Sequence, residues 1–233
     1  MQWESPLRWY IIASIVVIHM LILFFAVKNV QLRFFIPYVN STRGQGALLT
    51  FDDGPIDSDT LRVAETLSKH GVKGVFFLIG EQISEHQNIV KGLISMGHMI
   101  GNHSYSHAKN FPMMTTQSVV EDIEKCAGQI EPLTPQSIVP FRVPYGLTNP
   151  RIGRAVKRMN LLTIGWNLRS FDTMKSGDEV SKKLKKNIKN NSIVLLHDHS
   201  DFSKNNLDEF LQWAARNEIK FADPHAFIDS IQS

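Results

Sequence analysis

The sequence predicts an α/β domain with a parallel sheet, placed behind a single transmembrane helix at the N-terminus. From Gly46 onward, short apolar runs alternate with stretches of helical periodicity, a pattern typical of βαβ units. Before them lies a run of 19 residues, 9–27, in which only Ser14 and His19 are polar. No repeat, low-complexity stretch or interdomain linker divides the rest of the 233 residues, so we expect one domain and one appendage.

The composition excludes several classes of protein. Hydrophobic residues make up 43% of the chain and charged residues 20%, which excludes a disordered or collagen-like chain. Because 25 Lys and Arg face 22 Asp and Glu, the excess positive charge is too small for the basic stripe of a nucleic-acid-binding protein. Cys126 is the only cysteine, which excludes an intrachain disulfide and a CxxC site. A metal site would therefore use histidines and carboxylates.

The apolar run 9–27 predicts a membrane anchor. At about 1.5 Å per residue it reaches about 28 Å, close to the thickness of the hydrocarbon core of a bilayer. Trp9 and Tyr10 suit the membrane interface. A cleaved signal peptide is the alternative, but the run exceeds a usual signal-peptide core and lacks a small-x-small cleavage motif before Lys28. We therefore expect a tail at 1–8 and a single-pass anchor in a bacterial-type inner cell membrane.

The segment 28–46 is expected to tether the domain 47–233 to this anchor. As a flexible coil it spans on the order of 25 Å. Its aromatic and aliphatic residues Phe34, Phe35, Ile36 and Tyr38 either lie on the membrane surface or pack on the domain. The basic residues flanking the anchor are too few to decide on which side of the membrane the domain lies.

Helices and strands alternate along the domain. A first strand is expected at 47–51, and a helix follows at 57–69, with Leu61 and Leu67 on its apolar face and His70-Gly71 as its stop. A strand at 74–79, a helix at 88–96 and a short strand into Gly101 come next. The further expected helices are 117–130, 150–160, 178–189, 206–216 and 224–231, and the further strands are 138–141, 161–166, 192–196 and 219–221.

Two motifs follow early strands of the expected sheet, where α/β proteins gather their sites. In Thr-Phe-Asp-Asp-Gly-Pro at 50–55, one of the adjacent carboxylates Asp52 and Asp53 can face a metal while the other serves as a base, or the pair can form an acidic turn that caps a helix. His103 and His107 are four residues apart, so both rings share one face if the segment turns helically. Two histidines and one carboxylate leave open positions for water and substrate, as catalytic zinc sites do.

Two further motifs follow later strands. Arg142 precedes Val-Pro-Tyr-Gly and can orient a carboxylate through paired hydrogen bonds, although a solvated arginine before a turn is the plainer interpretation. The apolar run 193–196 ends in His197, and Asp172 lies within reach to tune that ring. A histidine at the end of a strand is often structural.

In order and spacing these motifs resemble the polysaccharide deacetylases of the NodB-homology type, carbohydrate esterase family four. The resemblance covers residues 47–221 and rests on TFDDGP at 50–55, HSYSH at 103–107, RVPY at 142–145 and LLH at 195–197. It implies a distorted (β/α) barrel of about seven parallel strands. It also implies a hydrolase that removes an N-acyl group, typically acetyl, from an amino sugar.

The resemblance further implies a role for each matching residue. Asp53, His103 and His107 would hold a divalent metal, usually zinc. Asp52 would be the general base, paired with Arg142.

The remaining implied roles concern the leaving group and the pocket. His197 would be the general acid, oriented by Asp172, and the backbone N–H of Tyr145 would stabilise the oxyanion. The pocket for the acyl group would be formed by Trp166, Leu195 and Pro144.

One motif departs from the family pattern Asp-x-x-Asp-Trp. Here the segment reads Arg169-Ser170-Phe171-Asp172-Thr173, so the second aspartate remains while the first is Arg169 and the tryptophan is Thr173. Arg169 either faces an anionic group of the substrate or is a solvated or structurally paired arginine.

The expected partners are the membrane and an N-acylated amino-sugar glycan, with no nucleic acid and no obligate protein partner. The glycan is either a sugar on a polyprenyl phosphate lipid or an envelope polymer such as peptidoglycan. Two other classes remain open: an inactive glycan-binding module, and a metal-dependent phosphoesterase that would draw extra ligands from Asp198 and His199.

Overall fold

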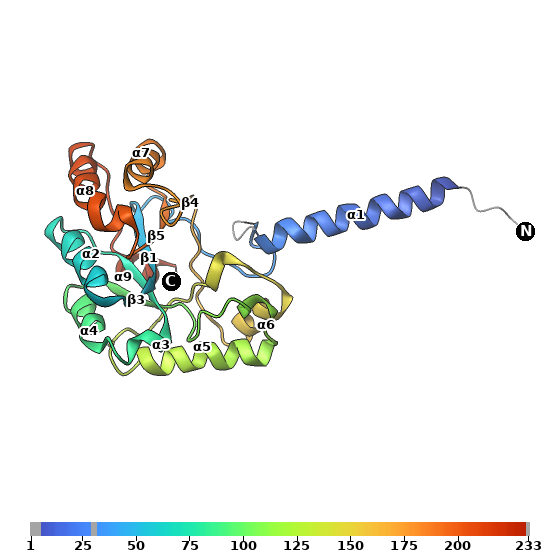
Figure 1. Ribbon diagram of the computed structural model, residues 1–233, viewed down its shortest axis with the longest axis horizontal. Coiled ribbons are helices and arrows are strands. Elements are labelled where there is room, and N and C mark those ends of the chain that lie inside the picture. Colours follow the sequence, from blue (N-terminus) through green and yellow to red (C-terminus); the bar gives the residue numbers. More distant parts are fainter. Residues whose placement is uncertain (1–5, 29–31, 232–233) are drawn as a thin grey trace, which may run out of the picture.

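The computed structural model describes residues 6–28 and 32–231 of the chain. Helix α1 (Pro6–Lys28) projects from an α/β domain (Figure 1). The stretch Arg8–Val27 has a mean hydropathy of 2.7 and is long and apolar enough to cross a membrane. Almost all of its described side chains are exposed.

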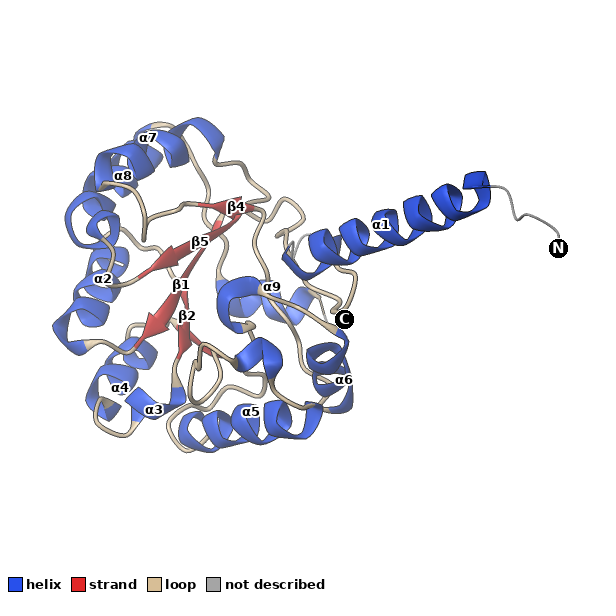
Figure 2. Ribbon diagram, turned by 45° about the vertical axis from the view of Figure 1, so that its right-hand side comes forward, coloured by secondary structure: helices blue, strands red, loops and turns tan. Residues whose placement is uncertain are grey.

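The domain is built on a five-stranded parallel sheet in the order β3-β2-β1-β5-β4 (Figure 2). The strands are β1 (Leu48–Gly54), β2 (Val75–Leu78), β3 (Met99–Asn102), β4 (Leu168–Arg169) and β5 (Ile193–His197). The α/β class and the parallel sheet expected from the alternating pattern are therefore confirmed. Parallel neighbours bring the carboxyl ends of β1, β3 and β5 to one edge of the sheet.

The expected helices are present, with ends within two residues of the predicted ones. They are α2 (Asp57–Lys69), α4 (Gln87–Ser95), α5 (Thr116–Ile130), α6 (Pro150–Arg158), α7 (Gly177–Asn187), α8 (Leu207–Arg216) and α9 (Pro224–Ser230). Local chemistry explains several starts: Asn149 caps α6, Asp223 caps α9, and Ser176 with Glu179 forms a capping box on α7. Helix α3 (Gly80–Ile83) has only four residues, too short to leave a periodic signal.

Three of the expected strands, 138–141, 161–166 and 219–221, are not strands in the described residues. They appear only as isolated bridges, Asn102↔Phe141, Phe141↔Thr163, Val39↔Ile164 and Ala47↔Phe221. Pro140 has no N–H to donate, so pairing beside β3 does not extend before Phe141. The five assigned strands thus fall short of the predicted seven.

Both faces of the sheet are buried, each under its own hydrophobic cluster. Side chains alternate along β1, so Leu49 and Phe51 join the cluster beneath α2, α7 and α8, while Leu48 joins the other. Asp52 has the parity of Leu48, and its register partner is His197 on β5. The strand pairing therefore sets a carboxylate and an imidazole side by side on the same face.

Part of the expected tether packs on the domain. Ile36 and Tyr38 are buried in the second cluster, with Phe35 against it, and Val39 N donates to the carbonyl oxygen of Thr163 at 2.9 Å. Of the two interpretations offered for this segment, packing on the domain holds for these residues. Phe34 differs, since 58% of its surface is exposed.

The carboxyl end of α1 is also held by the domain. Thr148, which is buried, donates from its N–H to the carbonyl oxygen of Val27 at 3.0 Å and from Oγ1 to that of Ala26 at 3.3 Å. Ala26 itself is 2% exposed, unlike the rest of the helix before it. Helix α1 therefore leaves the domain at a fixed point beside Thr148. Thr148 is the third residue after Tyr145.

A glycine pair tests how tightly the sheet is packed. A Cβ at Gly101 on β3 would overlap the ring of Phe77, whereas a Cβ at Gly128 on α5 would meet open space. We expect Gly101→Ala to lower the free energy of unfolding by about 1–3 kcal/mol. Gly128→Ala, the matched control, should raise it by about 0.5–1 kcal/mol because glycine weakens helix interiors. Thermal unfolding of the full chain in detergent measures both; equal stability of the two variants would contradict the packing.

Candidate metal centre and active site

Two adjacent carboxylates at the end of β1 reach the same pocket. Neighbouring side chains on a regular strand point to opposite faces, but the register between β1 and β2 shifts between Asp52 and Gly54. Asp53 in between has φ 74°, a left-handed conformation unusual for a residue other than glycine. The irregularity turns the Asp53 side chain back, so both carboxylates line one pocket.

His103 and His107 come together on a loop and not through the helical turn that would place residues four apart on one face. The segment after β3 has no helical residues, and Ser104 (φ 71°) and His107 (φ 44°) take left-handed conformations. Asp122 on α5 fixes this loop: it accepts hydrogen bonds from the backbone N–H of Tyr105 at 2.7 Å and from Oγ of Ser106 at 2.6 Å. The two imidazole rings end with centroids 4.8 Å apart.

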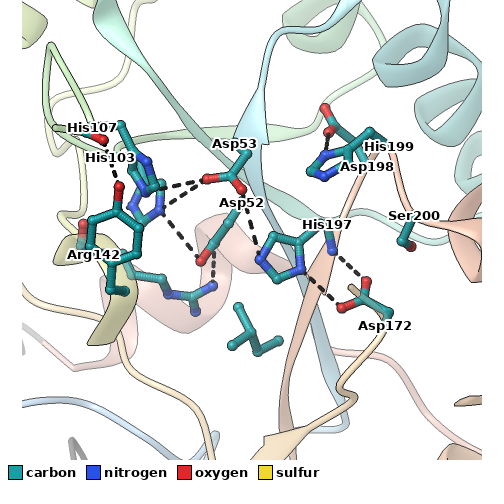
Figure 3. A network of polar contacts seen from close by, with 12 residues as sticks. Asp52, Asp53, His103, His107, Arg142, Asp172, His197, Asp198, His199 and Ser200 are labelled. Atoms are coloured by element: carbon teal, nitrogen blue, oxygen red, sulfur yellow. Dashed lines mark hydrogen bonds and ion pairs between the residues drawn. The ribbon is translucent and has the colours of Figure 1, made fainter. Parts of the chain in front are cut away.

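The two rings converge on Asp53 (Figure 3). Its Oδ1 lies 3.5 Å from Nε2 of His103 and 3.4 Å from Nε2 of His107. Among the described residues, these three side chains form the group whose ligand atoms all lie within 4.8 Å of one another. The sequence-predicted metal ligands are thus brought together.

The donor atoms of this group fit a divalent metal. Nδ1 of His103 donates to the carbonyl oxygen of Arg142 at 2.9 Å, which leaves the lone pair of Nε2 facing Asp53. Burial lowers the pKa of His103 and of His107, so both rings are neutral, as ligands must be. Burial raises the pKa of Asp53, whose Oδ1 is buried without a hydrogen-bond partner, and a cation would satisfy it. Two imidazoles and a carboxylate are ligands that suit zinc.

Asp52 is fixed by a buried arginine. Nη1 of Arg142 donates to Oδ1 of Asp52 at 2.7 Å, and the arginine side chain is fully buried. The other carboxylate oxygen, Oδ2, lies 3.7 Å from Nε2 of His103. The carboxylate therefore faces the ligand group of Asp53, His103 and His107 with Oδ2, while Arg142 balances its charge at Oδ1.

His197, at the end of β5, is fixed by Asp172. Nδ1 of the ring lies 2.9 Å from Oδ1 of Asp172, and the backbone N–H of His197 donates to Oδ2 at 2.7 Å. Burial lowers the pKa of His197, but the hydrogen bond and charge of Asp172, with the charges of Asp52 and Asp53, raise it to about 9. The imidazole is therefore protonated at neutral pH, and its Nε2 lies 3.9 Å from Oδ2 of Asp53.

These groups surround one pocket of about 300 Å³. Its lining consists of Asp52, Asp53, His103, His107, Tyr145, Gly146, Trp166, Arg169, Thr173, Leu195 and His197. Of the other sequence-predicted site residues, Arg142, Asp172 and Pro144 are buried nearby and do not line it. Tyr145 forms part of the rim, with φ 60° and a hydroxyl that donates to the carbonyl oxygen of His107 at 2.8 Å.

Arg169 is exposed on the pocket wall. Its guanidinium lies over the ring of Phe171, 4.9 Å from the centroid, and Lys183 lies over the same ring at 3.9 Å. Within residues 6–28 and 32–231, Arg169 has no carboxylate partner, and its structural contact is the ring of Phe171. The wall of the pocket thus carries one guanidinium, in addition to the carboxylates of Asp52 and Asp53.

Asp198 and His199 take a different place. Asp198 is fully buried and accepts a hydrogen bond from Oγ1 of Thr60 on α2. His199 Nδ1 lies 3.5 Å from Oδ1 of Asp198, and neither residue belongs to the metal group found in the described chain. Gly54 is required beside them, because a Cβ there would lie 2.6 Å from Oδ2 of Asp198.

Three supporting residues have no role in the sequence-based prediction. Thr50 Oγ1 accepts from Nη1 of Arg142 at 2.8 Å, and Ser170 Oγ donates to Oδ1 of Asp172 at 2.9 Å. Asp122 holds the histidine loop. Each acts through a contact between distant parts of the chain, which no local pattern encodes.

Several known proteins are similar to this chain. Residues 40–164 match the family Polysaccharide deacetylase. The peptidoglycan-N-acetylglucosamine deacetylase PgdA of Listeria monocytogenes is 32% identical to this chain. The match covers 70% of this chain and 34% of that relative. A chitooligosaccharide deacetylase of Azorhizobium caulinodans is 31% identical over 67% of this chain and 76% of its own.

The fold recurs in solved structures of carbohydrate esterase family four. One is a pseudoenzyme of that family from Bacillus anthracis, with a TM-score of 0.74 at 23% identity, covering 82% of this chain and 68% of that one. A pseudoenzyme on the same fold means that the fold alone does not establish activity. The family match over more than half of the chain and the similarity to deacetylases nevertheless lead to one conclusion: this chain belongs to the polysaccharide deacetylase family.

Proposed function

We propose that the protein is a metal-dependent N-deacetylase of an amino sugar in a glycan near the membrane. One observation carries the proposal: a metal group, a buried Asp–Arg pair and an Asp-oriented histidine meet in one pocket. The printed names of the relatives support it, since they concern peptidoglycan N-acetylglucosamine and chitooligosaccharides, both N-acetylated glycans.

The metal would be held by Asp53, His103 and His107, with zinc as the expected ion. When bound, it supplies a Lewis acid that polarises the carbonyl oxygen of the amide. Asp52 takes a proton from the attacking water, because its Oδ2 is free of Arg142 and faces the metal group. Arg142 orients that carboxylate and lies against it as a counter-charge.

The leaving group is protonated by His197, the register partner of Asp52 on β5. His197, held protonated by Asp172, donates its Nε2 proton to the departing amine. The backbone N–H of Tyr145 donates to the oxyanion of the tetrahedral intermediate. The products are a free amino sugar and acetate, or another short acid.

The pocket walls suit a small acyl group on a charged sugar. Trp166 and Leu195 supply apolar surface for the acyl methyl, and Pro144 stiffens the turn that carries Tyr145. Arg169, free of a carboxylate partner, is available to an anionic group of the substrate such as a phosphate. This favours a sugar on a polyprenyl phosphate lipid over a neutral polymer.

The location follows from α1. We propose that residues 9–27 anchor the chain in the inner membrane of a bacterial cell, after a tail at 1–8, and that 28–46 joins them to the deacetylase domain 47–233. The hydrogen bonds of Thr148 to the end of α1 keep the domain close to that anchor. The substrate is therefore a membrane-proximal glycan.

Acetate release from an N-acetylated chitooligosaccharide tests the activity. The full chain in detergent should release acetate. A chelator should abolish this activity, because the carbonyl is no longer polarised without the metal, and added zinc should restore it. Metal-dependent release of phosphate from a phosphate ester with no acetate from any N-acetylated sugar would identify a phosphoesterase instead. Metal binding without either product would identify an inactive module.

Two substitutions separate the base from the metal ligands. Asp52→Asn should lower kcat by at least about 100-fold, the usual contribution of a general base, while metal content stays near that of the wild type. His103→Ala should lose both activity and metal. Mass spectrometry of the metal and an acetate assay measure the two properties; a fully active Asp52→Asn variant would refute the role of Asp52.

The pH profile tests the His197–Asp172 pair. A general acid works only while protonated, so activity should fall as pH rises through about 9, the pKa of His197. Asp172→Asn removes a charge and a hydrogen bond that raise this pKa, so the alkaline limb should move to lower pH. Rates of acetate release from pH 6 to 10 measure it, with Asp178→Asn on the surface of α7 as the control. An unmoved limb would show that another group controls it.

A further inference from the structure

One stretch of chain joins the pocket, the end of α1 and a strongly basic helix. Tyr145 lies on the pocket rim, Thr148 bonds to the carbonyl oxygens of Ala26 and Val27, and α6 begins at Pro150. Thr148 is the third residue after Tyr145, so their Cα atoms are at most about 11 Å apart. The rim of the pocket therefore lies next to the point where α1 leaves the domain.

The exposed surface of α6 carries only positive charge. Its nine residues include no acidic side chain, and apart from Pro150 its exposed residues are Arg151, Arg154, Lys157 and Arg158. The whole chain has a net charge of only +3, so this concentration is local and not a property of the whole surface. Both ribbon views place α6 on the side from which α1 projects, with α2, α4 and α8 on the other side (Figures 1 and 2).

Exposed apolar side chains lie against the same helix. Met113 is 79% exposed, and its carbonyl oxygen accepts from Nη1 of Arg151 at 3.0 Å. Phe34 is 58% exposed, and its neighbour Phe35 packs against α6, where a Cβ on Gly153 would lie 2.5 Å from the Phe35 carbonyl oxygen. Large apolar side chains interspersed with cations are typical of surfaces that lie in a membrane interface.

A hollow at the start of α6 adds a place for an anion. It holds about 320 Å³ and is lined by Pro112, Asn149, Pro150, Arg151 and Arg154. Arg154 has no ion-pair partner within residues 6–28 and 32–231. Two guanidinium groups around such a hollow match the size and charge of a lipid phosphate.

We propose that this surface, formed by Phe34, Met113 and the basic residues of α6, docks on the anionic phospholipid headgroups of the membrane that α1 enters. We call it the lipid-facing surface. The proposal rests on the proposed function in one respect, since the pocket rim at its edge then receives an amino sugar carried on a membrane lipid, not a distant polymer strand.

The bilayer is the occupant that the geometry favours. Helix α1 leaves the domain at the edge of the lipid-facing surface, so a bilayer that contains α1 is already held against it. If the lipid-facing surfaces of two copies of this chain met, the four cations of one α6 would face the four cations of the other and repel them. Phospholipid headgroups offer the opposite charge and, beneath it, an apolar layer for Phe34 and Met113.

Collisional quenching by lipids tests the docking. The full chain in nanodiscs of phosphatidylglycerol with phosphatidylcholine carries a fluorophore on Met113→Cys, or on Ala215→Cys of α8 as the control; Cys126 is buried and stays unlabelled. Doxyl lipids should quench position 113 several-fold more than position 215. Quenching at 113 should fall in phosphatidylcholine alone and in the variant Arg151→Gln/Arg154→Gln. Equal quenching at both positions, or no dependence on anionic lipid, would overturn the docking.

A second arm separates docking from chemistry. Phe34→Glu/Met113→Glu should release acetate from a soluble chitooligosaccharide at the wild-type rate, but several-fold more slowly from N-acetylglucosamine on a polyprenyl pyrophosphate in the same nanodiscs. Equal rates on the lipid-linked sugar would count against the docking. If neither substrate yields acetate while the lipid-dependent quenching persists, the deacetylase proposal fails and the docking stands.

Discussion

The ion pair between Arg142 and Asp52 holds the site together. The arginine is fully buried, and besides Asp52 it donates to Thr50 Oγ1 and to the carbonyl oxygens of Ile164 and Gly165 at 2.8, 3.1 and 2.9 Å. One side chain thereby connects β1 to two irregular segments that no strand ladder joins. Removing one partner of such a buried pair typically costs about 3–5 kcal/mol, because the other charge is left uncompensated. The carbonyl oxygen of the same arginine also sets the tautomer of His103.

The sheet supplies the second constraint. Asp52 and His197 are register partners on adjacent parallel strands, so their backbones are separated by about 4.8 Å, the usual interstrand spacing. Asp53 reaches the same pocket only through the irregularity at the end of β1 and its left-handed conformation. Regular pairing thus sets the distance between the proposed base and acid, and a single irregular residue adds the carboxylate of the metal group.

The sequence predicts what local patterns encode. Helical periodicity placed α2 within one residue at both ends, and Thr-Phe-Asp-Asp-Gly-Pro marked the carboxylates. It missed features that depend on contacts between distant residues. The loop of Ser104 and His107 turns through left-handed backbone held by Asp122, not through a helix. The expected strands around Phe141 and Thr163 reduce to bridges because proline and irregular backbone interrupt them.

The hydrogen bonds between Thr148 and the end of α1 also matter for how the protein is isolated. A soluble form cut after Lys28 would remove both carbonyl acceptors and expose Thr148 to water. The segment from Tyr145 to Thr148 would then lose the hydrogen bonds that tie it to α1, although no residue of the pocket had been touched. Under the proposed function, turnover measured on such a fragment would therefore understate that of the intact chain, in which α1 also supports the segment of Tyr145.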